Sequence, residues 1–166
     1  MVTTLTFDPD CRPNAILSFM LRFVVASLAL FSLSACAIDN PDAPNYVADF
    51  QAKSTQFEHA IQKNANTTQD FAQSYTDYER FLDQELNRAY QQLQQQLGAT
   101  ENAQLKQSQR QWLAFRDAEF AFITHNWNTI NFGSSATISR GQYRSRLIKQ
   151  RVLTLLYYLQ NYRADL

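Results

Sequence analysis

The chain has 166 residues and carries 15 basic and 15 acidic side chains, with 12 Phe and 8 Tyr. About 130 residues follow Cys36, which is enough for one domain with an aromatic core. The two histidines, His59 and His125, stand alone, and the chain has no cysteine pair, phosphate-binding glycine loop or Gly-x-Ser-x-Gly motif. These gaps leave no metal, cofactor or catalytic site to propose, so we expect no enzymatic activity.

Residues 20–36 have the features of a bacterial lipoprotein signal peptide. Arg22 supplies a positive charge, and residues 23–33 form an apolar segment that is too short to remain as a membrane-spanning helix. Residues 33–36, Leu-Ser-Ala-Cys, then match a lipobox. We predict that the chain is cleaved before Cys36 and that Cys36 carries diacylglycerol, which anchors the protein to a membrane. An uncleaved N-terminal anchor helix is the alternative.

The neighbouring residues indicate a start site, a location and a tether. Residues 1–19 contain two aspartates and two prolines, which suit a signal peptide poorly, so we expect a start at Met20 rather than Met1 and take 1–19 as a start-site extension. Ala37 follows Cys36, and in Gram-negative bacteria this pattern directs lipoproteins to the outer membrane. We expect a protein at the outer membrane or the periplasmic side of the cell envelope. Residues 37–45, with two prolines, predict a tether before a domain at 46–166.

The domain is predicted to be all-α, a small helical bundle of three long helices plus a shorter N-terminal helix, because no proline follows Pro44 and helix-forming residues dominate. The short helix spans 46–63. The first long helix starts at a capping box formed by Thr67 and Asp70 and stops at Gly98. Its apolar residues are three or four apart, which predicts one buried stripe; they are Phe71, Tyr75, Tyr78, Leu82, Leu86, Ala89, Leu93 and Leu97.

The second long helix is predicted at 100–127, with an apolar face that includes Trp112, Phe115, Phe120 and Phe122. Residues 128–135 contain Gly-Ser-Ser and are predicted to form a loop. The third long helix is predicted at 137–162.

Polar side chains recur at helical spacing within these helices. On the first two long helices they lie four or seven residues apart, and an arginine on the third completes the set. The candidate residues of this network are Asp83, Asn87, Tyr90, Gln109, Arg116, Asp117 and Arg151. They either form a buried scaffold that fixes helix register or bind a ligand, and the scaffold is the favoured interpretation because unpaired buried polar groups are costly.

Two ordered motifs resemble a known family. Asp83-x-x-Leu86-Asn87-x-x-Tyr90 is followed by Leu105-x-x-x-Gln109-Arg110-x-Trp112-x-x-Phe115-Arg116-Asp117, with Gly133 and Arg151 further on. This arrangement is similar to the lysozyme-inhibitor LprI-like domain family and covers about residues 67–160. The resemblance implies a small, helical, exported protein. The family commonly has two cysteines where this chain has Ser74 and Phe120, so any function that depends on a disulfide is not implied.

The charges are segregated along the chain. Residues 37–87 contain nine acidic and three basic side chains, and residues 88–166 contain ten basic and four acidic ones. Helices of opposite charge that pair within the domain are one explanation, and an acidic face for a basic partner is the other. Candidate residues for such a face are Asp77, Glu79 and Glu85.

The signal peptide predicts an envelope lipoprotein, and the family resemblance implies that it inhibits lysozyme-type muramidases by protein–protein binding. Its expected partners are a membrane, through the N-terminal lipid, and a basic muramidase. No nucleic acid, metal or cofactor is expected. The alternative is a non-inhibitory envelope binding or assembly module, or an immunity partner of an exported toxin.

Overall fold

The computed structural model describes residues 44–162. Cys36, the start site at Met1 or Met20 and most of the tether lie outside the described residues, so those expectations stay predictions. Within residues 44–162 no helix is long and apolar enough to cross a membrane. In the same part of the chain, no three His, Cys, Asp or Glu side chains are grouped so that they could hold a metal ion.

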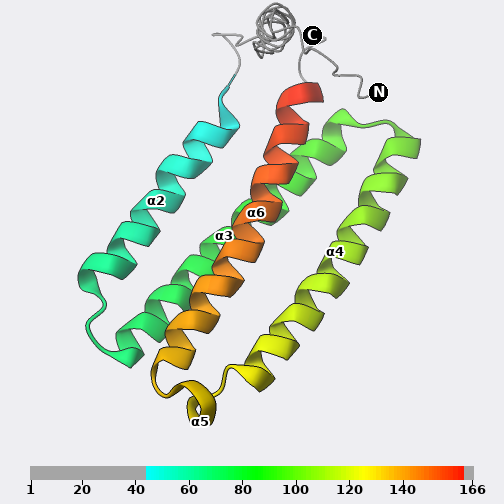
Figure 1. Ribbon diagram of the computed structural model, residues 1–166. Helices are drawn as coiled ribbons and strands as arrows, with labels where there is room; N and C mark the ends of the chain where they lie inside the picture. The colour runs from blue at the N-terminus through cyan, green and yellow to red at the C-terminus, as the bar shows by residue number, and fades with distance from the viewer. Residues whose placement is uncertain (1–43, 163–166) are drawn as a thin grey trace, which may run out of the picture. The chain divides into compact units, whose positions relative to one another are not determined.

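Five helices and no strands make up the described residues, which confirms the all-α prediction (Figure 1). Four of them are long. The helices are α2 (Tyr46–Asn64), α3 (Thr68–Gln96), α4 (Ala99–Asn126), α5 (Thr129–Phe132) and α6 (Ser135–Tyr162). Helices α3 and α6 pack along their length, with α2 on one side of this pair and α4 on the other (Figure 1).

The helix ends follow from local hydrogen bonds. The Asp70 backbone N–H donates to Thr67 Oγ1 at 3.1 Å and the Thr67 N–H donates to Asp70 Oδ2 at 2.9 Å, which is the predicted capping box. Helix α3 ends at Gln96, just before Gly98 as predicted, but Gly98 has φ −68 and so does not provide a left-handed C-terminal cap. Instead, Asn102 Nδ2 donates to the carbonyls of Gln94 and Leu97 at the end of α3.

The predicted loop at 128–135 contains a further helical turn. Asn128 Oδ1 accepts from the backbone N–H groups of Ile130 and Asn131, both at 3.0 Å, and so caps α5. Gly133 then adopts φ +59, which a glycine allows without strain, and α6 starts two residues before its predicted start. The loop prediction is therefore wrong for residues 129–132, where side-chain capping stabilises a turn too short for periodicity to reveal.

The core lies between α3 and α6 and is closed by Phe50 of α2, which is fully buried. The predicted stripe of α3 is confirmed from Tyr78 to Leu93, while Phe71, Tyr75 and Leu97 pack at its edges. On α2, the Phe57 ring stacks on Phe81 with centroids 4.6 Å apart. This packing fixes α2, α3 and α6 together.

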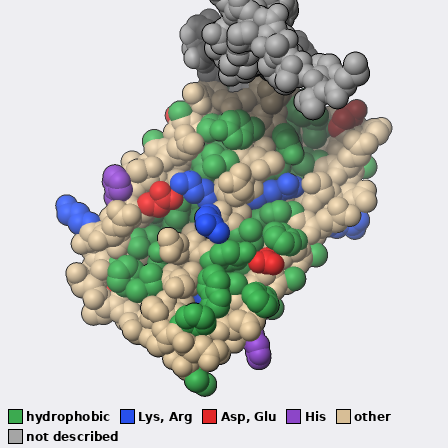
Figure 2. Space-filling model, viewed as in Figure 1, with side chains coloured by type: hydrophobic (Ala, Val, Ile, Leu, Met, Phe, Trp, Pro, Cys, Tyr) green, Lys and Arg blue, Asp and Glu red, His purple; other side chains and the backbone are tan. Residues whose placement is uncertain are grey.

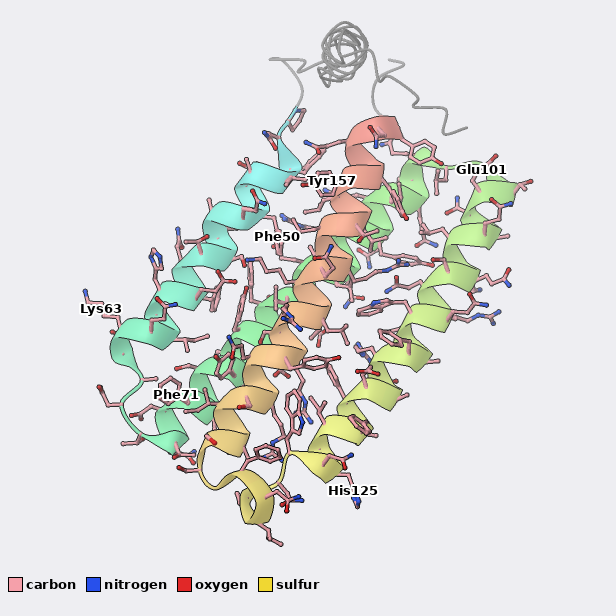
Figure 3. All side chains as sticks on the ribbon, in the orientation of Figure 1. Phe50, Lys63, Phe71, Glu101, His125 and Tyr157 are labelled. Carbon is pink, nitrogen blue, oxygen red and sulfur yellow. The ribbon has the colours of Figure 1, made fainter. Side chains whose placement is uncertain are left out.

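Helix α4 contributes little to this core. Its buried residues are only Leu105, Gln109 and Ile123. Phe115 and Phe122 are 50% and 60% exposed, so the prediction that they belong to the inward face is wrong. Long side chains fill the space between α4 and α6 (Figure 3). Trp112 and Phe120 do pack against the core as expected, and arginine and amide groups share the inward face of α4 with them.

Candidate functional site

Arginine and aromatic side chains alternate along the junction of α4 with α6, which we call the arginine–aromatic seam (Trp112, Arg116, Phe120, Arg144 and Arg151). The Arg116 guanidinium carbon lies 5.6 Å from the Trp112 ring centroid and 5.9 Å from that of Phe120. Arg151 lies 5.7 Å from Trp112, and Arg144 lies 5.1 Å from Phe120. At these distances each guanidinium makes a cation–π contact, so the seam fastens α4 to α6.

Arg116 also joins α4 to α3. Its Nη1 lies 3.9 Å from Asp83 Oδ1, and its Nε and Nη2 donate to Asp117 Oδ1 at 2.9 and 2.7 Å. The Asp83 side chain is 51% exposed, yet partial burial raises the pKa of its carboxyl, and the charge of Arg116 opposes this rise. Arg116 is thus held between an aromatic stack and two carboxylates.

Arg151 joins α6 to α4 in the same way. Its Nε donates to Gln109 Oε1 at 3.0 Å, and its Nη2 donates to Ser108 Oγ at 3.2 Å. Gln109 is buried, and burial lowers the pKa of Arg151 from its high ordinary value. The predicted polar set therefore forms two clusters, one at Arg116 and one at Arg151, with Trp112 between them.

Two members of the predicted network lie outside both clusters. Asn87 is exposed and has no hydrogen-bond partner among residues 44–162, so the expectation that it belongs to a buried network is wrong. The Tyr90 hydroxyl accepts from Gln94 Nε2 at 3.2 Å, a contact within α3. Of the three predicted residues on α3, only Asp83 reaches one of the two arginines.

The predicted acidic face is not a set of free charges. Asp77 pairs with Arg80 at 2.9 Å, and Glu85 is buried and paired with Arg88, so Glu85 cannot meet a partner from solvent. Burial raises the pKa of Glu79, and Asp83 adds to this rise while Arg144 opposes it. The expectation of a solvated surface shared by Asp77, Glu79 and Glu85 is wrong for Glu85.

The segregated charges meet inside the domain in two places. Asp83 faces Arg116, and Glu58 Oε1 accepts from Lys149 Nζ at 2.7 Å. Both pairs join the acidic first half to the basic second half, which supports complementary helices.

Of the two positions where the family commonly has cysteine, Phe120 lies in the arginine–aromatic seam and packs against the core, and Ser74 lies half-buried on α3.

A separate apolar surface lies at the α5 end of the bundle, which we call the α5 tip (residues 126–135). Ile130 is 92% exposed and Phe132 is 51% exposed. Asparagine amides hold the backbone of the α5 tip, since Asn126 Nδ2 donates to the Phe122 carbonyl and Asn131 Nδ2 donates to the Asn126 carbonyl. Figure 2 shows hydrophobic side chains at the lower end of the molecule, where Figure 1 places α5. The Gly-Ser-Ser sequence at residues 133–135 predicted a break between helices here, but it did not predict that Ile130 and Phe132 would be exposed.

The fold and these contacts define an all-α bundle in which ion pairs join α3 to α4 and α2 to α6, and in which one end presents apolar side chains. A family model of the lysozyme inhibitor LprI matches residues 60–155, more than half of the chain, and the chain therefore belongs to the LprI lysozyme inhibitor family. Comparison with curated proteins and with solved structures found no match. The family is one of inhibitors, which agrees with the expectation that the chain is not an enzyme.

Proposed function

We propose that this protein is a cell-envelope lipoprotein that inhibits a lysozyme-type muramidase by binding it through the α5 tip. Membership of the lysozyme inhibitor LprI family carries the inhibitory part of this proposal. The contact surface is argued from exposure, because a large apolar side chain that is 92% exposed, with Phe122 and Phe132 more than half exposed, is typical of an interaction site.

The form of the α5 tip supports insertion into a cleft. Residues 126–135 carry no charged side chain. The turn is narrow, a single helical turn between α4 and α6, and amide hydrogen bonds fix its backbone. A fixed turn loses little conformational entropy on binding, which favours affinity. A muramidase holds a polysaccharide chain in an open groove, and an uncharged narrow turn suits such a groove better than the internally paired acids of α3.

The test is residual activity of a basic lysozyme on a cell-wall suspension, measured against the concentration of the purified protein. Ile130→Ser and Phe132→Ser should each weaken inhibition about tenfold, because exposed apolar anchors dominate such contacts. Tyr157→Ser is the matched control, since Tyr157 on α6 is 51% exposed, as is Phe132. Added salt should change inhibition little, because the α5 tip is uncharged.

Two results would contradict the proposal at different levels. A parent protein that does not inhibit at about tens of micromolar, where even weak complexes form, rejects lysozyme inhibition and favours an envelope binding module or an immunity partner. Equal loss in the Tyr157 control and the two α5 tip variants, or no loss in any, keeps inhibition and rejects the α5 tip as the contact surface.

The envelope location rests on the sequence alone. The lipobox at residues 33–36 follows an apolar segment of signal-peptide length, and Ala37 favours the outer membrane. Mass spectrometry of the membrane fraction should find Cys36 as the N-terminal residue with diacylglycerol attached. An intact N-terminus at Met1 or Met20, or an unmodified Cys36, is the contrary result.

A further inference from the structure

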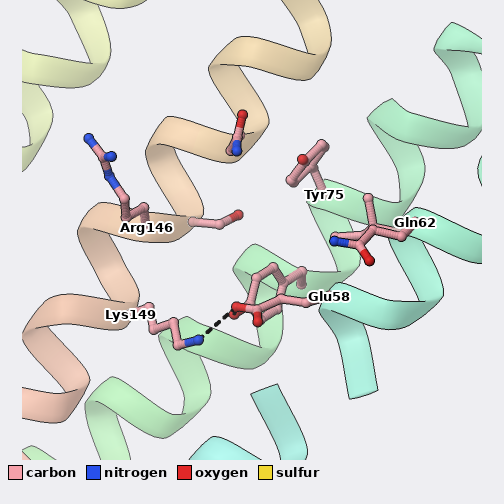
Figure 4. A pocket seen from close by; sticks show the side chains of 9 residues that line it. Glu58, Gln62, Tyr75, Arg146 and Lys149 are labelled. Carbon is pink, nitrogen blue, oxygen red and sulfur yellow. Dashed lines mark hydrogen bonds and ion pairs between the residues drawn. The ribbon is translucent and has the colours of Figure 1, made fainter. Parts of the chain in front are cut away.

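A cavity of about 300 Å³ lies among α2, α3 and α6 (Figure 4). Polar side chains from all three helices line it, including Gln62 of α2, Tyr75 of α3 and Arg146 of α6. No residue of the α5 tip contributes to the lining, so the cavity is a separate feature from the proposed inhibitory surface.

Ser145 provides the first sign of a ligand site. It lines the cavity, its side chain is only 3% exposed, and its hydroxyl has no hydrogen-bond partner. Buried hydroxyl groups in proteins are nearly always paired, because leaving one unpaired is unfavourable. A group that enters the cavity from outside would supply the missing partner.

The floor of the cavity is a satisfied network that holds one cation in place. Glu58 Oε1 accepts from Lys149 Nζ and from the Tyr78 hydroxyl, both at 2.7 Å, and the Tyr78 hydroxyl lies 2.5 Å from Ser54 Oγ. Burial alone would raise the pKa of Glu58, but these hydrogen bonds and the charge of Lys149 together lower it. Glu58 is therefore an ionised group whose Oε1 positions Lys149.

Because Arg146 is among the lining residues, the cavity has a net positive charge. Arg146 is exposed and forms no ion pair or hydrogen bond with residues 44–162. In Figure 4 its side chain extends away from Glu58 and Tyr75, and its guanidinium carbon lies 5.6 Å from the ring centroid of Tyr143, so this exposed side chain must rotate to bring the guanidinium over the cavity. The lining thus has two cations, Arg146 and Lys149, and one anion, Glu58. A guanidinium without a carboxylate partner is the group best shaped to bind one in two-point fashion.

The walls add neutral hydrogen-bonding groups. The side-chain amides of Gln62 and Gln142 are exposed and line the cavity, as does the ring of Tyr75. Burial, with the charge of Glu58 adding to it, raises the pKa of Tyr75, so its hydroxyl stays neutral. These groups suit a molecule that carries hydroxyl and amide substituents beside its charge.

We propose that this cavity binds a small carboxylate rich in hydroxyl and amide groups, such as an acidic amino sugar, with its carboxylate on Arg146, whose exposed side chain rotates toward the cavity, and a polar substituent on Ser145. The proposal does not depend on lysozyme inhibition.

The test compares two sugars that differ in one substituent. N-acetylmuramic acid carries a lactyl carboxylate that N-acetylglucosamine lacks, and binding of each to the purified protein is followed by calorimetry and by backbone amide chemical shifts. The acid should bind at least about tenfold more tightly, as expected for a charged, two-point contact, and should shift the amides of residues 142–149. Binding of neither sugar, or equal binding of both, overturns the proposal.

Three variants and one further anion separate this site from nonspecific attraction. Arg146→Gln should reduce binding of the acid to the level of the neutral sugar, whereas Arg140→Gln, on the same helix but outside the lining, should leave it unchanged. Ser145→Ala should weaken binding without lowering the melting temperature, because it removes an unpaired hydroxyl. Equal losses in the Arg140 and Arg146 variants, or inorganic phosphate binding as tightly as the sugar acid, would show generic anion attraction and overturn the proposal.

Discussion

The substitution Gly141→Ala tests how closely α3 and α6 pack. An added Cβ at Gly141 would lie 2.4 and 2.5 Å from Tyr75 ring atoms and 2.8 Å from Tyr75 Cβ. Rotation of the ring cannot relieve the contact with Cβ, so the helices themselves must separate. Alanine within a helix gains about 1 kcal/mol over glycine, while overpacking typically costs about 1–3 kcal/mol. We expect a net destabilisation of about 1 kcal/mol, because backbone-linked atoms clash.

Urea unfolding of four proteins measures this effect: the parent, Gly141→Ala, Tyr75→Ala and the double variant. Once Tyr75 is reduced to alanine, the ring clash is gone and the helix propensity of alanine dominates, so the second substitution should be less costly or stabilising. A parent protein that becomes more stable with Gly141→Ala would refute the close packing of Tyr75 against α6. An equal cost of Gly141→Ala in both backgrounds would attribute the change to another neighbour.

Two further predictions follow from the polar contacts. Arg116→Ala should lower the free energy of unfolding by about 1–2 kcal/mol through lost aromatic and ionic contacts. Asn87→Ala should change it by no more than about 0.5 kcal/mol, because the Asn87 side chain is exposed. Equal denaturant midpoints for the two variants would contradict a stabilising role of Arg116 in the arginine–aromatic seam. Folding lowers the pKa of Glu58 from its ordinary value of 4.5. The ionised carboxylate therefore stabilises the fold above pH 4.5, and this stabilisation is lost as the pH falls through the lower pKa of the folded state. Glu58→Gln should therefore flatten the fall in melting temperature below about pH 4.5, and an unchanged acid profile would count against the Glu58–Lys149 pair.

The sequence predicted those features that depend on local spacing. The α3 stripe from Tyr78 to Leu93 and the Thr67–Asp70 capping box follow from residues three or four positions apart. The burial of Glu85 could also have been foreseen, because Glu85 is three residues after Leu82 and four before Ala89 and thus belongs to the same stripe. Its charge led us to place it in solvent, and pairing with Arg88 is what permits its burial.

Other features depend on which helices become neighbours, and spacing within one helix cannot show that. Glu58 and Lys149 are 91 positions apart, and the cavity at Ser145 requires residues from three helices. On α4, Phe115 and Phe122 repeat every seven residues as an inward face would. The inward face carries Trp112 and Phe120 together with Gln109 and Arg116, because α3 and α6 present polar or charged groups to the latter two.

The way in which α4 is attached has a consequence for local stability. Helix α6 buries eight residues, whereas α4, also 28 residues long, buries three. Guanidinium–aromatic and hydrogen-bonding contacts hold the rest of α4, and these groups regain water when they separate, unlike buried leucines. Segments with few buried apolar contacts open at lower free energy than the core. Helix α4 can therefore detach as a cooperative unit while α2, α3 and α6 stay folded, so its amide protons exchange with solvent through openings that leave the core intact.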